Sequence, residues 1–274
     1  MIASRWANRP RPSAIASTAA KDFAIARSYR MALFMDVFFG FINIVVYFFI
    51  SRTFGDARTA DLGGASTYFA FVTVGASITV VIQTAVGSVS GGVRDGQVTG
   101  TLEALAVQPV TAAEMALGFA AYPVLFALTR VVVYILMADL IFGLDLARPD
   151  WPGFVMTIAA TGIALLSLGV LMGALVLLFK RGGSLGAVMA FAMGFSSGAF
   201  FPISVLPGWL RIVGEVMPTR FAFDGVRAAL FAGDGWALDA VVLLVMGGLG
   251  LPVAVWAFKV ALGRAEAEGT LGQY

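Results

Sequence analysis

Six long apolar stretches limit what this chain can fold into. They cover residues 31–50, 66–90, 115–142, 153–179, 184–200 and 236–262. A helix needs about 20 apolar residues to cross the hydrocarbon core of a bilayer, and all but the fifth stretch reach that length. Backbone polar groups inside a membrane must be hydrogen-bonded within the protein, which a helix achieves by itself. The sequence therefore predicts an all-α polytopic membrane protein with six transmembrane helices.

The composition agrees with this class and removes much enzyme chemistry. Charged residues make up 12% of the chain and hydrophobic residues 59%, whereas a soluble domain has about a quarter charged residues. Cysteine and histidine are both absent, which excludes disulfides, thiolate nucleophiles, imidazole bases and the commonest metal ligand. We therefore predict no catalytic residues and no metal site, and a membrane enzyme would lack a plausible catalytic cluster.

The ends of the chain suggest its orientation. Residues 1–30 are basic, and from Ser13 to Arg30 apolar residues recur at helical spacing, which is typical of an amphipathic helix lying against anionic lipid head groups. A solvated basic tail is the alternative. Lysine and arginine are more numerous in the loops on the side of the amino terminus, so both termini are expected in the cytoplasm. Residues 31–262 would form one transmembrane domain, and 263–274 a cytoplasmic tail.

A polar segment, Arg94–Pro109, separates the second and third apolar stretches. A threonine of Thr99-Gly100-Thr101 can cap a short helix, which Pro109 would end. Leu102 and Leu105 would share its apolar face, and Glu103 would lie in its first turn, where a carboxylate suits the helix dipole. This predicts a cytoplasmic surface helix that fits a cleft on a soluble partner; an ordinary interfacial loop helix is the alternative.

A second unusual segment, Gly198–Arg227, is apolar but broken by proline. Pro202, Pro207 and Pro218 cannot continue a helix. A broken apolar segment at membrane depth must be covered by protein or line a cavity. We expect a re-entrant helical hairpin at the outer face, followed by a short amphipathic helix whose polar side carries Arg220, Asp224 and Arg227.

Together these two segments resemble the permease subunit of type-2 ABC exporters, which include daunorubicin-resistance-type drug exporters and polysaccharide exporters. The inner motif is carried by Arg94, Asp95, Gly100, Thr101, Leu102, Glu103 and Pro109. The outer motif is carried by Phe201, Pro202, Leu206, Pro207, Trp209, Pro218 and Arg227. The family often has a glutamate just before the Gly-Thr pair, where this chain has Val98-Thr99.

The resemblance implies the partners and the location. The chain has no GxxxxGK[ST] phosphate loop, so ATP and Mg²⁺ would bind a separate cytoplasmic ATPase, two copies of which would join two permease chains in a homodimer or heterodimer. The segment Arg94–Pro109, including Leu105, would dock on the ATPase. A bacterial plasma membrane, contacts with its lipids, and no nucleic-acid partner are expected. The substrate would be amphipathic or hydrophobic and drug-like, or else a lipid or lipid-linked glycan.

Four polar residues within the apolar stretches are candidates for the transport pathway or for an ion pair: Asp36, Gln83, Arg130 and Asp139. An unpaired Arg130 in the third span would cost about 2.5–3.5 kcal/mol on insertion scales. Asp36 or Asp139 could neutralise it. An ion-coupled secondary transporter is the remaining alternative, but it should show more intramembrane carboxylates or paired broken helices, and only one broken segment is present.

Overall fold

The computed structural model describes residues 11–54, 62–101, 110–146, 149–179 and 182–267. Every secondary-structure element in these ranges is a helix. Five of these helices are long and apolar enough to cross a membrane, which confirms the predicted all-helical polytopic class. They are α2 (Arg30–Phe54), α3 (Tyr68–Val98), α5 (Ala112–Phe142), α6 (Trp151–Phe179) and α10 (Trp236–Ala267).

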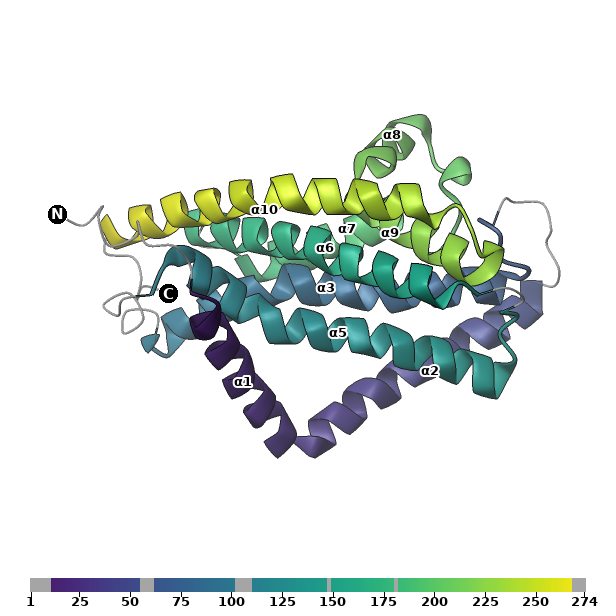
Figure 1. Cartoon of the computed structure of the whole chain (residues 1–274), viewed down its shortest axis with the longest axis horizontal. Coiled ribbons are helices and arrows are strands. Elements are labelled where there is room, and N and C mark those ends of the chain that lie inside the picture. The colour runs from purple at the N-terminus through teal and green to yellow at the C-terminus, as the bar shows by residue number, and fades with distance from the viewer. Residues whose placement is uncertain (1–10, 55–61, 102–109, 147–148, 180–181, 268–274) are drawn as a thin grey trace.

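Helix α3 lies at the centre of the bundle, between α5 and α6 (Figure 1). Of its most apolar window, 78% is buried within the protein, against 6% for α2. Small residues permit this packing: a Cβ atom added to Gly169 of α6 would lie 2.1 Å from the backbone oxygen of Ala85 on α3. Helix α10 packs along the other side of α6, so α3, α5, α6 and α10 enclose the core.

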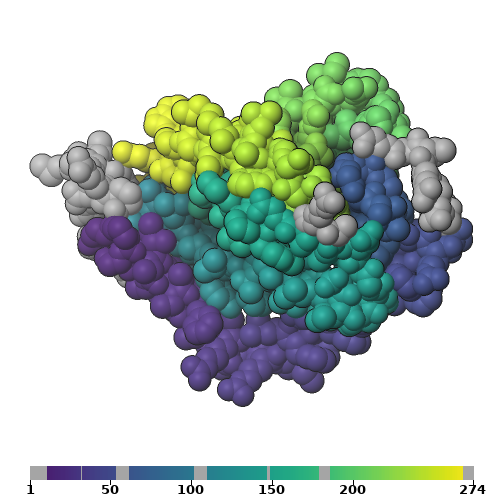
Figure 2. Space-filling view, turned by 45° about the vertical axis from the view of Figure 1, so that its right-hand side comes forward, coloured from purple at the N-terminus to yellow at the C-terminus, as the bar shows by residue number. Residues whose placement is uncertain are grey.

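Helix α1 (Pro12–Ser28) confirms the helix predicted for the amino-terminal segment. It packs on the first half of α5, where the rings of Phe23 and Tyr122 are 6.1 Å apart. Helices α1 and α2 meet near Tyr29 and diverge along one side of the bundle, as the purple ribbons and atoms of Figures 1 and 2 show. Helix α2 is therefore the least covered of the long helices.

The fifth predicted span is shorter than expected. Helix α7 (Gly182–Ser196) has 15 residues and ends at Ser196 instead of Phe200. At about 22 Å long it is shorter than the hydrocarbon core of about 30 Å. The remaining predicted spans each correspond to one of the five long helices.

The chain breaks at the three prolines, as predicted. Pro202 precedes a 3₁₀ turn, η2 (Ile203–Val205), Pro207 precedes α8 (Gly208–Val216), and Pro218 begins α9 (Pro218–Arg227). A π-helical turn, η3 (Ala228–Ala232), connects α9 towards α10. Helix α8 protrudes from the bundle in light green in Figures 1 and 2 and contacts the end of α7, where Gly214 lies against the backbone oxygen of Ser196.

Candidate functional site

The cation within the third span is paired with Asp36. Nη1 of Arg130 donates to Oδ2 of Asp36, and Nη2 donates to Oγ1 of Thr84 at 3.2 Å. The guanidinium also lies 5.2 Å from the ring centroid of Phe126. Asp139, nine residues further along α5, forms no ion pair with any described residue. Of the two carboxylates that the sequence offered, the structure therefore selects Asp36.

The same contact holds α2 against α5. The hydroxyl of Tyr134 donates to the backbone oxygen of Asp36 at 3.3 Å. One turn further along α2, a Cβ atom on Gly40 would lie 2.0 Å from that hydroxyl. Position 40 of α2 therefore has to be a glycine, because the Tyr134 side chain occupies the space of a Cβ atom. Together, the ion pair and the Tyr134 hydrogen bond attach α2, the least buried of the long helices, to the core of the bundle.

Next to the ion pair, two cavities open between α2 and α3. One has a volume of about 380 Å³ and is lined by Asp36, Phe39, Thr84 and Arg130. The other, of about 160 Å³, continues towards Tyr47 and Phe200. Both are lined by the same five residues: Gly40, Asn43, Val80, Gln83 and Tyr134. We call the two together the α2–α3 cleft.

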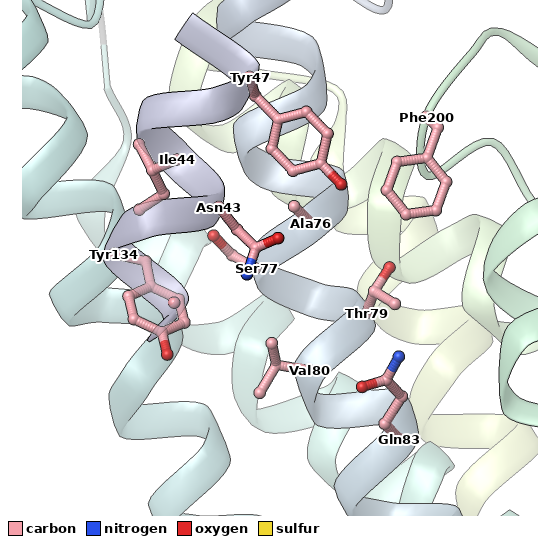
Figure 3. A pocket seen from close by; sticks show the side chains of 11 residues that line it. Asn43, Ile44, Tyr47, Ala76, Ser77, Thr79, Val80, Gln83, Tyr134 and Phe200 are labelled. Atoms are coloured by element: carbon pink, nitrogen blue, oxygen red, sulfur yellow. The ribbon is translucent and has the colours of Figure 1, made fainter. Parts of the chain in front are cut away.

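Figure 3 shows the smaller cavity of the cleft, which extends towards Tyr47 and Phe200. Asn43 projects from α2, and Thr79 and Gln83 project from α3, while Tyr47 and Phe200 lie at the upper end. The rings of Tyr47 and Phe200 are 6.1 Å apart. The cleft therefore joins amide and hydroxyl groups to aromatic surface, which suits a ligand with both polar and apolar parts.

A third cavity lies between α3 and α7. It has a volume of about 510 Å³, and small side chains line it together with Gln83 and Arg94. Gln83 lines all three cavities. Its side chain is exposed and makes no hydrogen bond with any described residue. Among the four predicted polar residues, Gln83, Asp36 and Arg130 meet at these cavities, whereas Asp139 does not line them.

The first residues of the predicted inner segment, Arg94–Pro109, belong to α3 and not to a separate loop. Arg94 and Asp95 belong to the last turns of α3, which continues to Val98, because nothing in that stretch interrupts helical hydrogen bonding. Thr99 closes the helix, and its hydroxyl lies 2.8 Å from the hydroxyl of Thr101. Gly100 has a φ of +68°, a conformation that glycine adopts readily. Leu102, Glu103, Leu105 and Pro109 lie outside the described residues, so the short helix expected there stays a prediction.

A buried carboxylate that the sequence analysis missed marks the start of α5. Glu114 and Thr111 form a capping box, in which the Glu114 side chain accepts from Thr111 N–H at 2.7 Å and the Thr111 hydroxyl accepts from Glu114 N–H at 3.1 Å. Glu114 also accepts from the backbone N–H and Nε of Arg11, at 2.6 and 3.1 Å. The spacing Thr-x-x-Glu was a readable signal for the cap, but the contact with Arg11 was not readable.

At the outer segment, Arg227 corrects a second expectation. The sequence placed it on the polar side of an amphipathic helix with Arg220 and Asp224, but its side chain is only 2% exposed. Nη2 donates to the backbone oxygens of Phe71, Gly198 and Ala199 at 3.1, 2.9 and 3.3 Å. Burial lowers the pKa of Arg227 to about 9, so the side chain is still protonated at neutral pH.

The other residues of the outer motif are separated by the fold. Phe201 packs edge-on to Phe195 of α7, with ring centroids 4.8 Å apart, whereas Trp209 on α8 is 71% exposed. Arg211 pairs with Glu215, and Arg220 pairs with Asp224. A cavity of about 320 Å³ between these pairs is also lined by Pro202 and Arg227. Pro207 and Pro218 act as helix starts, and Leu206 is half-buried between η2 and α8.

Five long apolar helices, with a proline-broken segment beside them and polar cavities along the central helix, define a multi-pass membrane protein. The family model of the ABC-2 type transporter matches residues 19–231, from the middle of α1 to the π-helical turn. The chain belongs to this family, and its membrane domain is the permease component of an ABC transporter. A comparison with curated proteins found no match.

The sequence analysis did not identify several residues of the cleft. Asn43, Tyr47, Thr79 and Tyr134 each lie within an apolar stretch, where short polar side chains such as those of Asn and Thr can bond to the backbone of their own helix. Thr79 does bond to Gly75 in this way. Only the packing of α2 beside α3 and α5 brings these residues to one space.

Proposed function

We propose that this chain is the permease subunit of an ABC exporter that moves an amphipathic or hydrophobic, drug-like compound outward across a bacterial plasma membrane. The match of residues 19–231 to the ABC-2 type transporter family carries this proposal. ATP and Mg²⁺ bind a separate cytoplasmic ATPase, and two ATPase chains act on two permease chains. Both termini lie in the cytoplasm.

The arrangement of helices suggests how the ATPase acts on the cleft. Residues 102–109, which would dock on the ATPase, connect the end of α3 to the start of α5. Thr84 and Gln83 of α3 and Arg130 and Tyr134 of α5 belong to the cleft. Because a helix transmits an axial or lateral push along its length, displacement of residues 102–109 would alter the cleft. This is a rigid-element transmission of the hinge-and-shear kind.

Helix α1 would move with the same segment. Arg11 at the beginning of α1 is bonded to Glu114, five residues beyond Pro109. Since α1 leads directly into α2, this contact connects the docking segment to α2, the wall of the cleft that lies opposite α3. Because Glu114 both caps α5 and binds Arg11 at the start of α1, it couples the positions of the two helices.

Co-purification from the native membrane tests the proposal. The tagged chain in mild detergent should retain an ATPase that contains a phosphate loop, identified by mass spectrometry. The variant Glu103→Arg should lose that ATPase, whereas Asp145→Arg, an equivalent charge reversal in the loop between α5 and α6, should retain it. If no such ATPase accompanies the wild-type chain in any detergent, the proposal is wrong and ion-driven transport becomes the next test.

A further inference from the structure

The charge that the α2–α3 cleft presents is negative, although its ion pair is neutral as a whole. The Asp36 side chain is 49% exposed, and that of Arg130 only 10%. Oδ2 of Asp36 accepts from Arg130, while Oδ1 accepts from no described residue. Arg130 directs its Nη atoms to Asp36 and Thr84, and its Nε is buried. A ligand in the cleft therefore meets a free carboxylate oxygen and a shielded guanidinium.

The neutral polar groups of the cleft add acceptors. The Asn43 amide nitrogen donates to the backbone oxygen of Phe39 at 2.9 Å, which leaves its side-chain oxygen as the free end. Gln83 keeps both its amide oxygen and nitrogen free of the described residues. With Oδ1 of Asp36, three side-chain oxygens of α2 and α3 are thus available to hydrogen-bond donors.

Aromatic surface lies beside these acceptors. Phe39, on the same cavity as Asp36, is 61% exposed. Tyr47 and Phe200 form the far end of the adjoining cavity. Aromatic faces attract cations and cover apolar groups. One ligand could therefore place a cationic group at Asp36 and an apolar part towards Tyr47.

We propose that the α2–α3 cleft binds an amphipathic organic cation. Its protonated amine donates to Oδ1 of Asp36, and its further N–H or O–H groups donate to the side-chain oxygens of Asn43 and Gln83. Its apolar body lies against Tyr47 and Phe200. The inference rests on the proposed exporter function, because it names the substrate class that the permease would take. Arg130 pairs with Oδ2 of Asp36 and offsets part of its negative charge in the absence of a ligand.

The arrangement disfavours an anionic ligand for the same reasons. An anion would approach the half-exposed carboxylate of Asp36, whereas the guanidinium of Arg130 is only 10% exposed and already donates to Asp36 and Thr84. A neutral ligand would gain the hydrogen bonds and the apolar contacts without the charge. Like charges at close range cost binding energy and opposite charges gain it, so the three ligand charges should differ in affinity.

A matched set of probes tests the charge preference. Monodansylcadaverine carries an ammonium, its N-acetyl derivative is neutral, and dansyl-aminohexanoate carries a carboxylate on a chain of similar length. Binding to the purified full chain in nanodiscs of zwitterionic lipid is followed by fluorescence anisotropy, with empty nanodiscs of the same lipid subtracted. The wild-type chain should bind the ammonium probe about tenfold more tightly than either of the others.

Two substitutions should move the preference in opposite directions. Asp36→Asn removes the negative charge and leaves Arg130 unpaired, so the ammonium probe should bind about tenfold more weakly and the carboxylate probe more tightly than to the wild type. Arg130→Gln frees Asp36 and should strengthen binding of the ammonium probe. Asp139→Asn, a matched change on α5 outside the cleft, should leave all three affinities unchanged.

Equal binding of the three probes by the wild type, or undiminished ammonium binding by a folded Asp36→Asn variant, would overturn the inference. If Asp36→Asn does not fold, Arg130→Gln decides, because a weaker ammonium complex in that variant contradicts the proposed role of Asp36. The assay uses no ATPase. Charge-selective binding by a chain that captures no ATPase in the co-purification would therefore refute the exporter proposal alone, and capture of an ATPase by a chain that binds the three probes equally would refute this inference alone.

Discussion

The guanidinium of Arg227 lies 3.6 Å from the ring centroid of Phe71, stacked at the end of α3 nearest the proline-broken segment. The same side chain donates to the backbone oxygens of Gly198 and Ala199, just after α7 ends. These two residues follow the last residue of α7, so their carbonyl oxygens lie outside its hydrogen-bonding pattern, and Arg227 supplies a donor to both. A single residue of α9 thus joins α3 to the turn between α7 and α8.

Loss of this contact should destabilise the fold. Arg227→Met keeps much of the side-chain volume but removes the guanidinium that donates to the carbonyl oxygens of Gly198 and Ala199. A hydrogen bond to a charged group contributes about 1.5–3 kcal/mol. We therefore expect Arg227→Met to lower the free energy of unfolding by about 2–3 kcal/mol, which is measured as a lower unfolding midpoint in detergent. Arg211→Met is the control, because its pair with Glu215 is exposed and contributes little to stability. Equal midpoints for the two variants would contradict the role assigned to Arg227.

The turn after α7 also depends on Gly75 of α3. A Cβ atom at this position would lie 1.8 Å from the backbone oxygen of Ala199, so Gly75→Ala must push α3 away from the turn. Overpacking of this kind costs about 1–3 kcal/mol. Gly248→Ala on α10 is the matched change, since a Cβ atom there meets nothing within 4 Å, and alanine favours a helix by up to about 1 kcal/mol. Thermal unfolding of both variants should show a decrease for the first and none for the second.

Glu114 should control how firmly α1 is held. In Glu114→Gln the side chain retains its shape but loses the charge that attracts Arg11, and in Glu114→Ala the cap is lost as well. Loss of a cap costs about 0.5–2 kcal/mol. We expect trypsin to cleave after Lys21 and Arg27 faster in both variants, with the alanine variant faster than the glutamine variant. Asp22→Asn serves as the control for cleavage after Arg27, because the contact of Asp22 with Lys21 is long, at 3.9 Å; faster cleavage after Arg27 in that variant alone would rule out the proposed role of Glu114.

Most of the helical architecture was predictable, because it depends on local properties of the chain. Length and apolarity define α2, α3, α5, α6 and α10, and the missing amide hydrogen of Pro202, Pro207 and Pro218 stops helices wherever the chain folds. The errors lie at the ends. Helix α3 includes Arg94 and Asp95 because polar residues continue a helix as readily as apolar ones, and α7 stops early at Ser196.

The pairing of side chains was not predictable to the same extent. Spacing grouped Arg227 with Arg220 and Asp224, yet the carbonyl oxygens of Gly198 and Ala199 draw it into the protein. The sequence offered both Asp36 and Asp139 to Arg130, and only the approach of α2 to α5 decided between them. The contact of Arg11 with Glu114 joins residues 103 positions apart, so no local pattern could indicate it.

Local chemistry therefore accounts for the membrane class, the helices and their breaks, since hydrophobic length and backbone hydrogen bonding are properties of each segment alone. The cleft, its exposed carboxylate and the buried arginine at the outer turn arise from which helices lie side by side. That choice is made by close contacts such as Gly40 with Tyr134 and Gly75 with Ala199. Such contacts depend on the shapes of two surfaces at once, and a single segment of sequence specifies only one of them.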